Sequence, residues 1–255
     1  RVMWINNKCV FSSYDKRKLD LNIKIIEANH KGTAGKTLIK AENIIFSTGK
    51  RNIIDGLNLE IKAGERIVLL GENGCGKTTL MRSLAKLNKL SGGKITQSLT
   101  KSEKANSKWF SQVGYVYQNP TYQLFMPTLL SEISYKAKSE DYAKEMIKAF
   151  GLEGLEQRHP QSLSQGQKRR ASIAAICAGK PQILFLDEPT VGQDYENLCR
   201  IVHTINRLNK EFDTAVVTVT HDKRCACALA DKVLIMDKGK IVKEGDSSLA
   251  NEFLE

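Results

Sequence analysis

The sequence predicts an α/β fold in which helices cover both faces of a mostly parallel β-sheet. Uninterrupted apolar runs at 67–70, 113–117, 183–186 and 215–220 are typical of strands that are buried on both faces. Segments with helical patterning alternate with these runs, as in parallel sheets. One run also leads directly into a glycine-rich motif of the kind that joins a strand to a helix around a phosphate.

Alternation and turn residues predict the remaining elements. Apolar alternation in 41–46 and 57–61 predicts an antiparallel sheet ahead of the glycine-rich motif. Helices are expected from Leu129 to Phe150 with an interruption near Ser139, and a hairpin is expected around Lys238 and Gly239. Residues 1–37 fit either an added strand pair or a connector from an upstream domain.

The composition favours one soluble domain. The chain has 255 residues, of which 41% are hydrophobic, and this is enough for a large core. No apolar run approaches the ~20 residues that span a bilayer, and no signal peptide opens the sequence. Six cysteines beside a phosphate-binding motif favour a reducing cytosol over a disulfide framework. The start at Arg1 fits a fragment or a trimmed chain.

The net charge of +11 is unevenly distributed. Residues 1–160 hold 26 Lys/Arg against 15 Asp/Glu, whereas residues 161–255 hold 13 of each. A solvated basic face is the default interpretation, nearness to a membrane surface is the second, and nucleic acid is the third, because the basic residues are scattered among few aromatics. No nucleic-acid partner is expected.

The glycine-rich motif fits G-x-x-x-x-G-K-[ST] and is followed by a helical pattern that opens with Thr79. Backbone N–H groups of such a loop curve around a β-phosphate, towards which the helix also directs its positive end. The lysine reaches the β- and γ-phosphates, and the threonine hydroxyl is placed to ligate Mg²⁺. The candidate nucleotide-binding residues here are Gly71, Glu72, Asn73, Gly74, Cys75, Gly76, Lys77, Thr78 and Thr79.

The apolar run 183–186 ends in Asp187 and Glu188, so a second parallel strand is expected to deliver two carboxylates to the same sheet edge. Asp187 is predicted to lie near the Mg²⁺ shell. Alternation along the strand makes Glu188 the better candidate to activate water against the γ-phosphate.

Residues 163–174 begin with Leu-Ser-Gln-Gly-Gln and resemble the signature sequence of ATP-binding-cassette (ABC) ATPases. Gln165 stands where that family usually has glycine. The resemblance implies that ATP lies between two subunits and that Ser164, Gln165, Gly166 and Gln167 contact the γ-phosphate bound by the opposite one. It covers residues 38 to 246 and implies a P-loop NTPase fold with an N-terminal antiparallel β subdomain and a helical subdomain that carries the signature.

Three further motifs of the family occur at the expected places along the chain, one before the signature and two after it. Gln118 matches the Q-loop glutamine, which implies a place in the shell of Mg²⁺ and water. Asp194 matches the D-loop aspartate, and His221 matches the switch histidine that holds the γ-phosphate and orients Glu188. The adenine-stacking aromatic of the family has no clear counterpart; Phe46 is the candidate substitute.

The Q-loop extension from Gln118 to Phe125 resembles that of energy-coupling-factor transporter ATPases, which drive vitamin and metal-ion uptake. The resemblance implies an ATPase that works with Mg²⁺ in a homo- or heterodimer. It also implies binding to integral membrane subunits through this segment and a cytoplasmic position on the inner face of the membrane. Residues 38–255 are the expected ATPase domain, with a helical subdomain at about 119–175. The alternative is a non-transport ABC ATPase that acts on ribosomes or nucleic acid.

Overall fold

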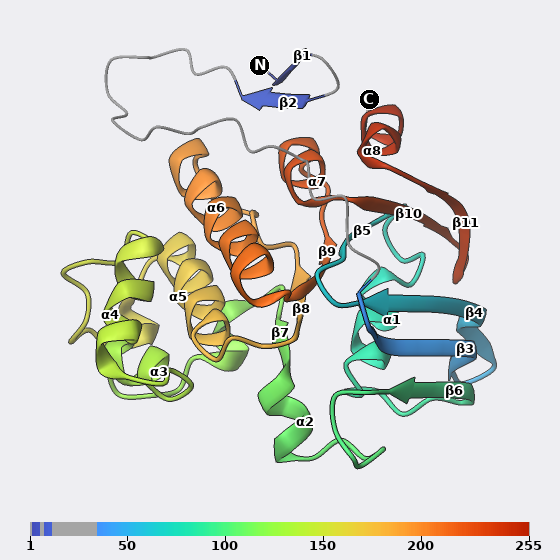
Figure 1. The fold of residues 1–255 in the computed structure, drawn as a ribbon, viewed down its shortest axis with the longest axis horizontal. Coiled ribbons are helices and arrows are strands. Elements are labelled where there is room, and N and C mark those ends of the chain that lie inside the picture. The colour runs from blue at the N-terminus through green and yellow to red at the C-terminus, as the bar shows by residue number, and fades with distance from the viewer. Residues whose placement is uncertain (1, 6–7, 12–34, 255) are drawn as a thin grey trace.

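The computed structural model of the chain describes residues 2–5, 8–11 and 35–254 (Figure 1). Its helices are α1 (Lys77–Leu84), α2 (Ser107–Gln112), α3 (Leu129–Ser134), α4 (Glu140–Ala149), α5 (Gln165–Cys177), α6 (Tyr195–Phe212), α7 (Lys223–Leu229) and α8 (Ser247–Phe253), with 3₁₀ turns η1 (Pro120–Gln123) and η2 (Pro160–Ser162). Within the described ranges, no helix is both long and apolar enough to cross a bilayer.

The central sheet has the order β11-β10-β5-β9-β8-β7. Its strands are β5 (Arg66–Leu70), β7 (Val113–Val116), β8 (Ile183–Asp187), β9 (Ala215–Val219), β10 (Lys232–Asp237) and β11 (Lys240–Gly245). All neighbours are parallel except the β10–β11 hairpin. Every residue of β5, β7, β8 and β9 is buried, which is why these strands read as continuous apolar runs. The predicted α/β fold is confirmed.

A three-stranded antiparallel sheet has the order β4-β3-β6, with strands β3 (Thr37–Thr48), β4 (Arg51–Lys62) and β6 (Gly92–Gln97). The first two were expected from their alternation. β6 was not predicted, because it comes after α1 in the sequence and begins with two glycines, Gly92 and Gly93. Glycine weakens the strand signal, but Gly93 has φ +78° and an added Cβ would lie 2.2 Å from the Asn43 carbonyl oxygen.

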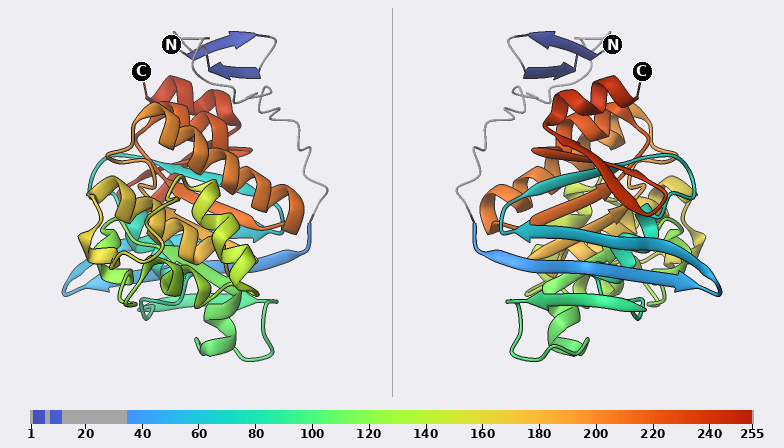
Figure 2. Two further views of the ribbon diagram at one scale, coloured as in Figure 1. Left: turned by 90° about the vertical axis from the view of Figure 1, so that its left-hand side faces the viewer. Right: turned by 90° about the vertical axis from the view of Figure 1, so that its right-hand side faces the viewer.

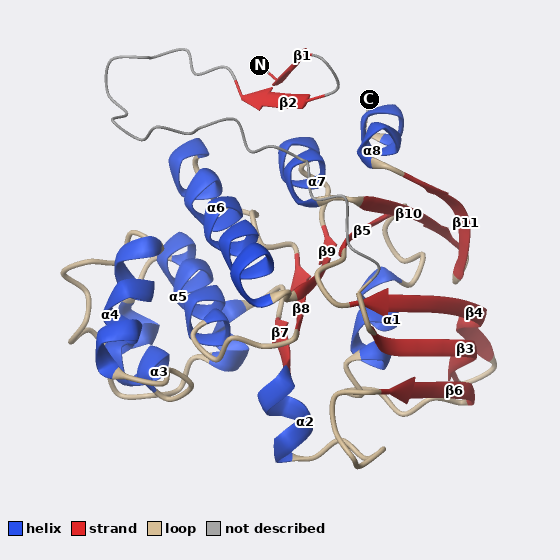
Figure 3. Ribbon diagram, in the orientation of Figure 1, coloured by secondary structure: helices blue, strands red, loops and turns tan. Residues whose placement is uncertain are grey.

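Two apolar clusters cover opposite faces of the central sheet. One joins the helices α3, α4 and α5 to residues such as Val116 and Leu186, and the other packs α1 and the antiparallel sheet against Leu69 and Phe185. The helices α3–α5 therefore lie on one side of the molecule and strands β3, β4 and β6 on the other (Figure 3). The expected interruption near Ser139 is present, since α3 ends at Ser134 and Ser139 caps α4.

The N-terminal segment contributes two short strands, β1 (Val2–Ile5) and β2 (Lys8–Phe11), which pair antiparallel with Val2 opposite Phe11. They can be seen near the N-terminus in both views of Figure 2. The rest of residues 1–34, to which the alternative expectation of a connector also applies, lies outside the described residues.

Candidate nucleotide-binding site

The loop between β5 and α1 has a shape that requires glycine. Gly71 has φ +145°, and a Cβ there would lie 2.3 Å from the backbone oxygen of Met236; Gly76 has φ +109°, and its Cβ would lie 2.8 Å from the oxygen of Ile53. The Lys77 ammonium donates hydrogen bonds to the carbonyl oxygens of Gly71 and Glu72, at 2.7 and 2.8 Å. The loop thus holds its lysine folded over the turn.

Asp187 lies at the C-terminal end of β8, where it meets the first turn of α1. The Thr78 hydroxyl donates to its Oδ1 at 3.2 Å, and the Tyr115 hydroxyl faces its Oδ2 at 3.5 Å. Burial raises the pKa of Asp187, and the Thr78 hydrogen bond and the nearby Arg82 charge oppose that shift. Thr78 and Asp187 therefore place two oxygen ligands side by side.

Glu188 leaves the strand rather than continuing it. Its φ is +51°, so the chain turns into the left-handed region, while its N–H still donates to the Val219 carbonyl at 2.9 Å. The position of its carboxylate follows from this turn and not from the strand alternation expected from the sequence. A left-handed non-glycine residue costs about 1–3 kcal/mol and is typical of functional sites.

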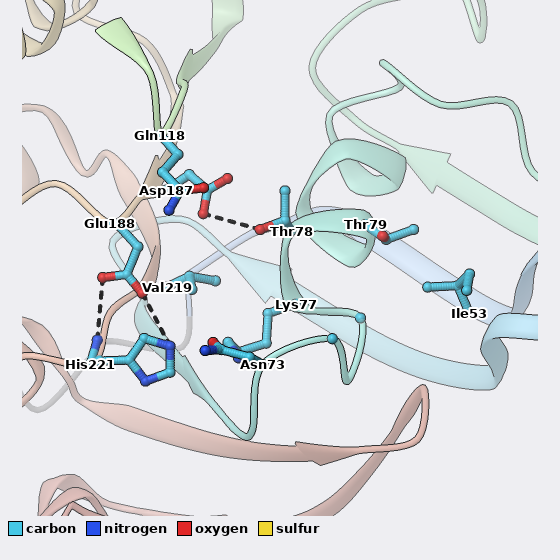
Figure 4. Close-up of a pocket in the computed structure, with 12 residues that line it drawn as sticks. Ile53, Asn73, Lys77, Thr78, Thr79, Gln118, Asp187, Glu188, Val219 and His221 are labelled. Carbon is cyan, nitrogen blue, oxygen red and sulfur yellow. Dashed lines mark hydrogen bonds and ion pairs between the residues drawn. The ribbon is translucent and has the colours of Figure 1, made fainter.

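The Glu188 carboxylate contacts His221 twice. Its Oε2 accepts from the His221 backbone N–H at 3.3 Å, and its Oε1 lies 3.4 Å from the imidazole Nε2 (Figure 4). Burial raises the pKa of Glu188 to about 7, and the His221 N–H partly opposes the shift. Burial, together with the Lys77 charge, lowers the pKa of His221. Near neutral pH the pair is therefore a carboxyl poised to exchange its proton beside a neutral imidazole.

These groups line one open cavity of about 210 Å³ (Figure 4). Its walls are Ile53, Asn73, Gly74, Gly76, Lys77, Thr78, Thr79, Gln118, Asp187, Glu188, Val219 and His221. The structure thus brings together the strand ends and the loop that the sequence assigned to phosphate. Gly71, Glu72 and Cys75 belong to the loop but not to the lining.

Phe46 lies outside the lining of this cavity. It pairs with Ile54, whose side chain is fully buried, and packs half-buried against the core. The neighbouring Ile53 lines the cavity instead. Sequence reasoning missed Ile53 because the face to which each side chain of β3 and β4 points depends on the pairing register. That register shifts at several points.

The signature residues start α5 and also lie outside the cavity lining. Ser164 is the N-cap: its hydroxyl accepts from the Gln167 N–H at 3.3 Å, and the Gln167 side chain accepts from the Ser164 N–H at 3.0 Å. Ser164 and Gln165 are exposed. The Gly166 carbonyl accepts from the amide of Gln193.

Two arginines of the signature helix, Arg169 and Arg170, hold it beside the site. Gln193 also accepts from Arg170 at 3.0 Å, and the next residue, Asp194, caps α6 by accepting from the Asn197 N–H at 2.8 Å. Arg169 donates to the Tyr117 carbonyl at 3.1 Å and reaches the Asp187 carbonyl at 3.5 Å. Sequence reasoning missed Arg169. The arginine pair at 169–170 directly precedes small and apolar residues, and this pattern could have indicated a buried arginine with a fixed partner.

The sequence model of the ABC transporter family matches residues 54–191. The energy-coupling factor transporter ATP-binding protein EcfA2 of Clostridium tetani is 37% identical over 228 residues, which cover 82% of this chain and 79% of that protein. A relative from Caldanaerobacter subterraneus is 36% identical over 222 residues, and there the match covers 83% of this chain but only 39% of the relative.

Two solved structures share the fold. The cbiO1 structure from Clostridium perfringens, part of the ABC transporter complex cbiONQ, has a TM-score of 0.71 at 28% identity and covers 85% of this chain and 91% of that chain. A dimeric ATP-binding cassette, MJ0796, bound to ADP and Pi, has a TM-score of 0.72 at 25% identity and covers 82% and 99%. The resemblance read from the sequence motifs is thereby confirmed. The chain belongs to the ABC transporter family.

Proposed function

We propose that this chain is the ATP-hydrolysing subunit of an importer of the energy-coupling-factor type, in which ATP binding and hydrolysis drive uptake of a vitamin or metal ion through membrane partners. The observation that carries the proposal is the convergence of Lys77, Thr78, Asp187, Glu188 and His221 on one cavity. The relatives described above are named as transporter proteins, which favours transport over the non-transport alternative.

The residues present fit Mg²⁺. Thr78 and Asp187 offer a hydroxyl and a carboxylate within hydrogen-bond distance of each other, and Gln118 adds an amide oxygen from the same cavity wall. Mg²⁺ prefers hard oxygen ligands of this kind, with one or two protein carboxylates and with phosphate and water oxygens in the remaining positions. When bound, the ion would neutralise charge on the phosphate oxygens.

Glu188 is the proposed general base. Its carboxyl, with a pKa of about 7, can take a proton from water near neutral pH, whereas an ordinary glutamate would be a weaker base. His221 orients it through the two contacts described above and faces the same cavity as Lys77. Ile53, rather than Phe46, is the proposed apolar contact for the base of the nucleotide.

A second cassette is proposed to complete the site. The cavity of about 210 Å³ is smaller than the roughly 300–1,000 Å³ of typical ligand pockets, so one chain covers only part of a nucleotide. Exposed Ser164 and Gln165, with Gly166 and Gln167, are available to the nucleotide of a partner chain. The dimeric cassette among the structural neighbours supports this arrangement.

The membrane subunit is proposed to bind the segment from Gln118 to Phe125. Tyr122 is 75% exposed and Phe125 is 69% exposed. Two large apolar side chains so exposed to water would be buried by a partner surface. The chain would then lie on the inner face of the membrane, with residues 38–255 as the ATPase domain and 119–175 as its helical subdomain.

Gel filtration of Glu188→Gln tests whether bound ATP joins two cassettes. Without its general base, the variant is expected to retain ATP and to elute as a dimer with ATP and Mg²⁺, and as a monomer without them. Lys77→Ala, which removes the phosphate anchor, is the matched control and should stay monomeric throughout. A Glu188→Gln protein that holds ATP yet remains monomeric would contradict the proposal.

Pull-down from native membranes tests transport. The wild type is expected to capture an integral membrane protein, and Tyr122→Ala with Phe125→Ala to lose it while ATP binding persists. Phe253→Ala removes a 38% exposed aromatic from α8 and serves as the control that keeps capture. If the double variant captured as much as the wild type, the contact would lie elsewhere.

A further inference from the structure

One stretch of the chain is almost free of acidic residues. Residues 73–131 contain eight Lys/Arg and a single acidic residue, Glu103. Two of the eight serve the nucleotide site, since Lys77 is buried and the Arg82 charge acts on Asp187. The other six are lysines, and they account for over half of the chain's net charge of +11.

Five of these lysines are exposed and gather at one end of the molecule. We call them the basic edge; they are Lys89, Lys94, Lys101, Lys104 and Lys108. They lie before and in β6, in the loop that follows it, and in α2. β6 is the outer strand of the antiparallel sheet, and β7, which directly follows α2, is the outer strand of the central sheet. Figures 1 and 2 place α2 and β6 at the end opposite α7, α8 and the C-terminus.

The lysines of this edge outnumber the carboxylates beside them. On the rest of the surface some lysines pair with carboxylates, as in Lys144–Glu140 at 2.7 Å and Lys232–Glu244 at 2.8 Å. Of the ion pairs between described residues, none involves a lysine of the basic edge. Lys94 faces the Glu42 carboxylate across the β3–β6 ladder, and Glu103 lies in the same loop as Lys101 and Lys104. Like charges held together in this way attract an extended anionic surface.

An exposed aromatic side chain accompanies the lysines on a firmly anchored helix. Trp109 is fully buried, its Nε1 donates to the Ala85 carbonyl at 3.0 Å, and the Lys86 ammonium lies 4.4 Å from its ring. The next residue, Phe110, is 40% exposed, and Leu87 is 36% exposed. Lysines around an exposed aromatic side chain are typical of protein segments that bind at the headgroup layer of a membrane.

We propose that the basic edge, with Phe110, binds the anionic headgroups of the membrane surface and so orients the chain beneath its membrane partner. The inference rests on the proposed function, because it requires work at a membrane. One short strand joins the basic edge to the proposed membrane-subunit contact: α2 precedes edge strand β7, and the Gln118–Phe125 segment follows it. Single-stranded nucleic acid is disfavoured, since α2 exposes one aromatic ring and no stacking platform.

Vesicle co-sedimentation of the 255-residue chain tests the proposal. Wild type is expected to sediment with vesicles that contain phosphatidylglycerol, but not with phosphatidylcholine alone, and added salt should release it. Lys101→Gln, Lys104→Gln and Lys108→Gln together should weaken partitioning roughly 100-fold, because each lysine near an anionic surface contributes about 1 kcal/mol. ATP hydrolysis should be unchanged in this variant, since none of the three residues lines the nucleotide cavity.

The control carries the same change of charge at other places. Lys50→Gln, Lys148→Gln and Lys210→Gln alter three exposed lysines outside the basic edge and should leave vesicle binding intact. Equal binding of the two triple variants, no binding of wild type to anionic vesicles, or binding of an oligonucleotide in place of vesicles would each overturn the inference. The vesicles contain no protein, so failure to capture a membrane subunit would count against the proposed function alone.

Discussion

Replacing Glu188 by glutamine should stabilise the fold while abolishing hydrolysis. The side chain is 9% exposed and lies beside Asp187, and burial raises its pKa to about 7. Glutamine has the same shape and can still accept the His221 N–H, but it carries no charge to bury. The substitution therefore isolates the free-energy cost of the charge.

The size of the effect follows from linkage between protonation and folding. An unfolded glutamate has a pKa of about 4.3, so between that value and about 7 the unfolded chain loses its proton before the folded chain does. The stability that the protonated carboxyl contributes is present below the unfolded pKa and is lost as pH rises through the folded one. At about 1.4 kcal/mol per pKa unit, the loss is about 4 kcal/mol at pH above 7.

Urea unfolding at two pH values measures this loss. Glu188→Gln should exceed wild type in unfolding free energy by about 4 kcal/mol near pH 8, and by only about 1 kcal/mol near pH 5. Glu196→Gln, at an exposed site on α6, should change stability by at most about 0.5 kcal/mol at either pH. If Glu188→Gln were no more stable than wild type at pH 8, the carboxylate would not carry the burial cost argued here.

Two further substitutions probe the site and the helix beneath the basic edge. Thr78→Val removes the hydroxyl that donates to Asp187, so Mg²⁺-dependent ATP hydrolysis should fall roughly 100-fold. Thr78→Ser keeps a hydroxyl and should retain hydrolysis. If Thr78→Val matched wild type in a Mg²⁺ titration, Thr78 would not be a ligand of the ion. Trp109→Phe removes the hydrogen bond to the Ala85 carbonyl and leaves a small void, so the unfolding free energy should fall by about 2 kcal/mol. An unchanged urea midpoint would show that the indole does not anchor α2.

The buried strands and the phosphate loop were predictable because each is written in consecutive residues. Continuous apolar runs have few structural solutions, and the glycines at 71, 74 and 76 take positive φ angles that other residues resist. β6 and Ile53 were not predictable in the same way. A glycine-led strand has a weak local signal, and the choice between Phe46 and Ile53 depends on strand register, which is set by a partner strand and shifts at bulges.

The sequence by itself determined the chemistry available to this protein: a loop for phosphate, a carboxylate pair, a histidine after a buried strand and a signature turn. Only the tertiary structure decided what these groups do to one another. Thr78 meets Asp187 across 109 positions of sequence because parallel strands end at one sheet edge. The raised pKa of Glu188 arises from burial, and burial is a property of packed neighbours rather than of residue order.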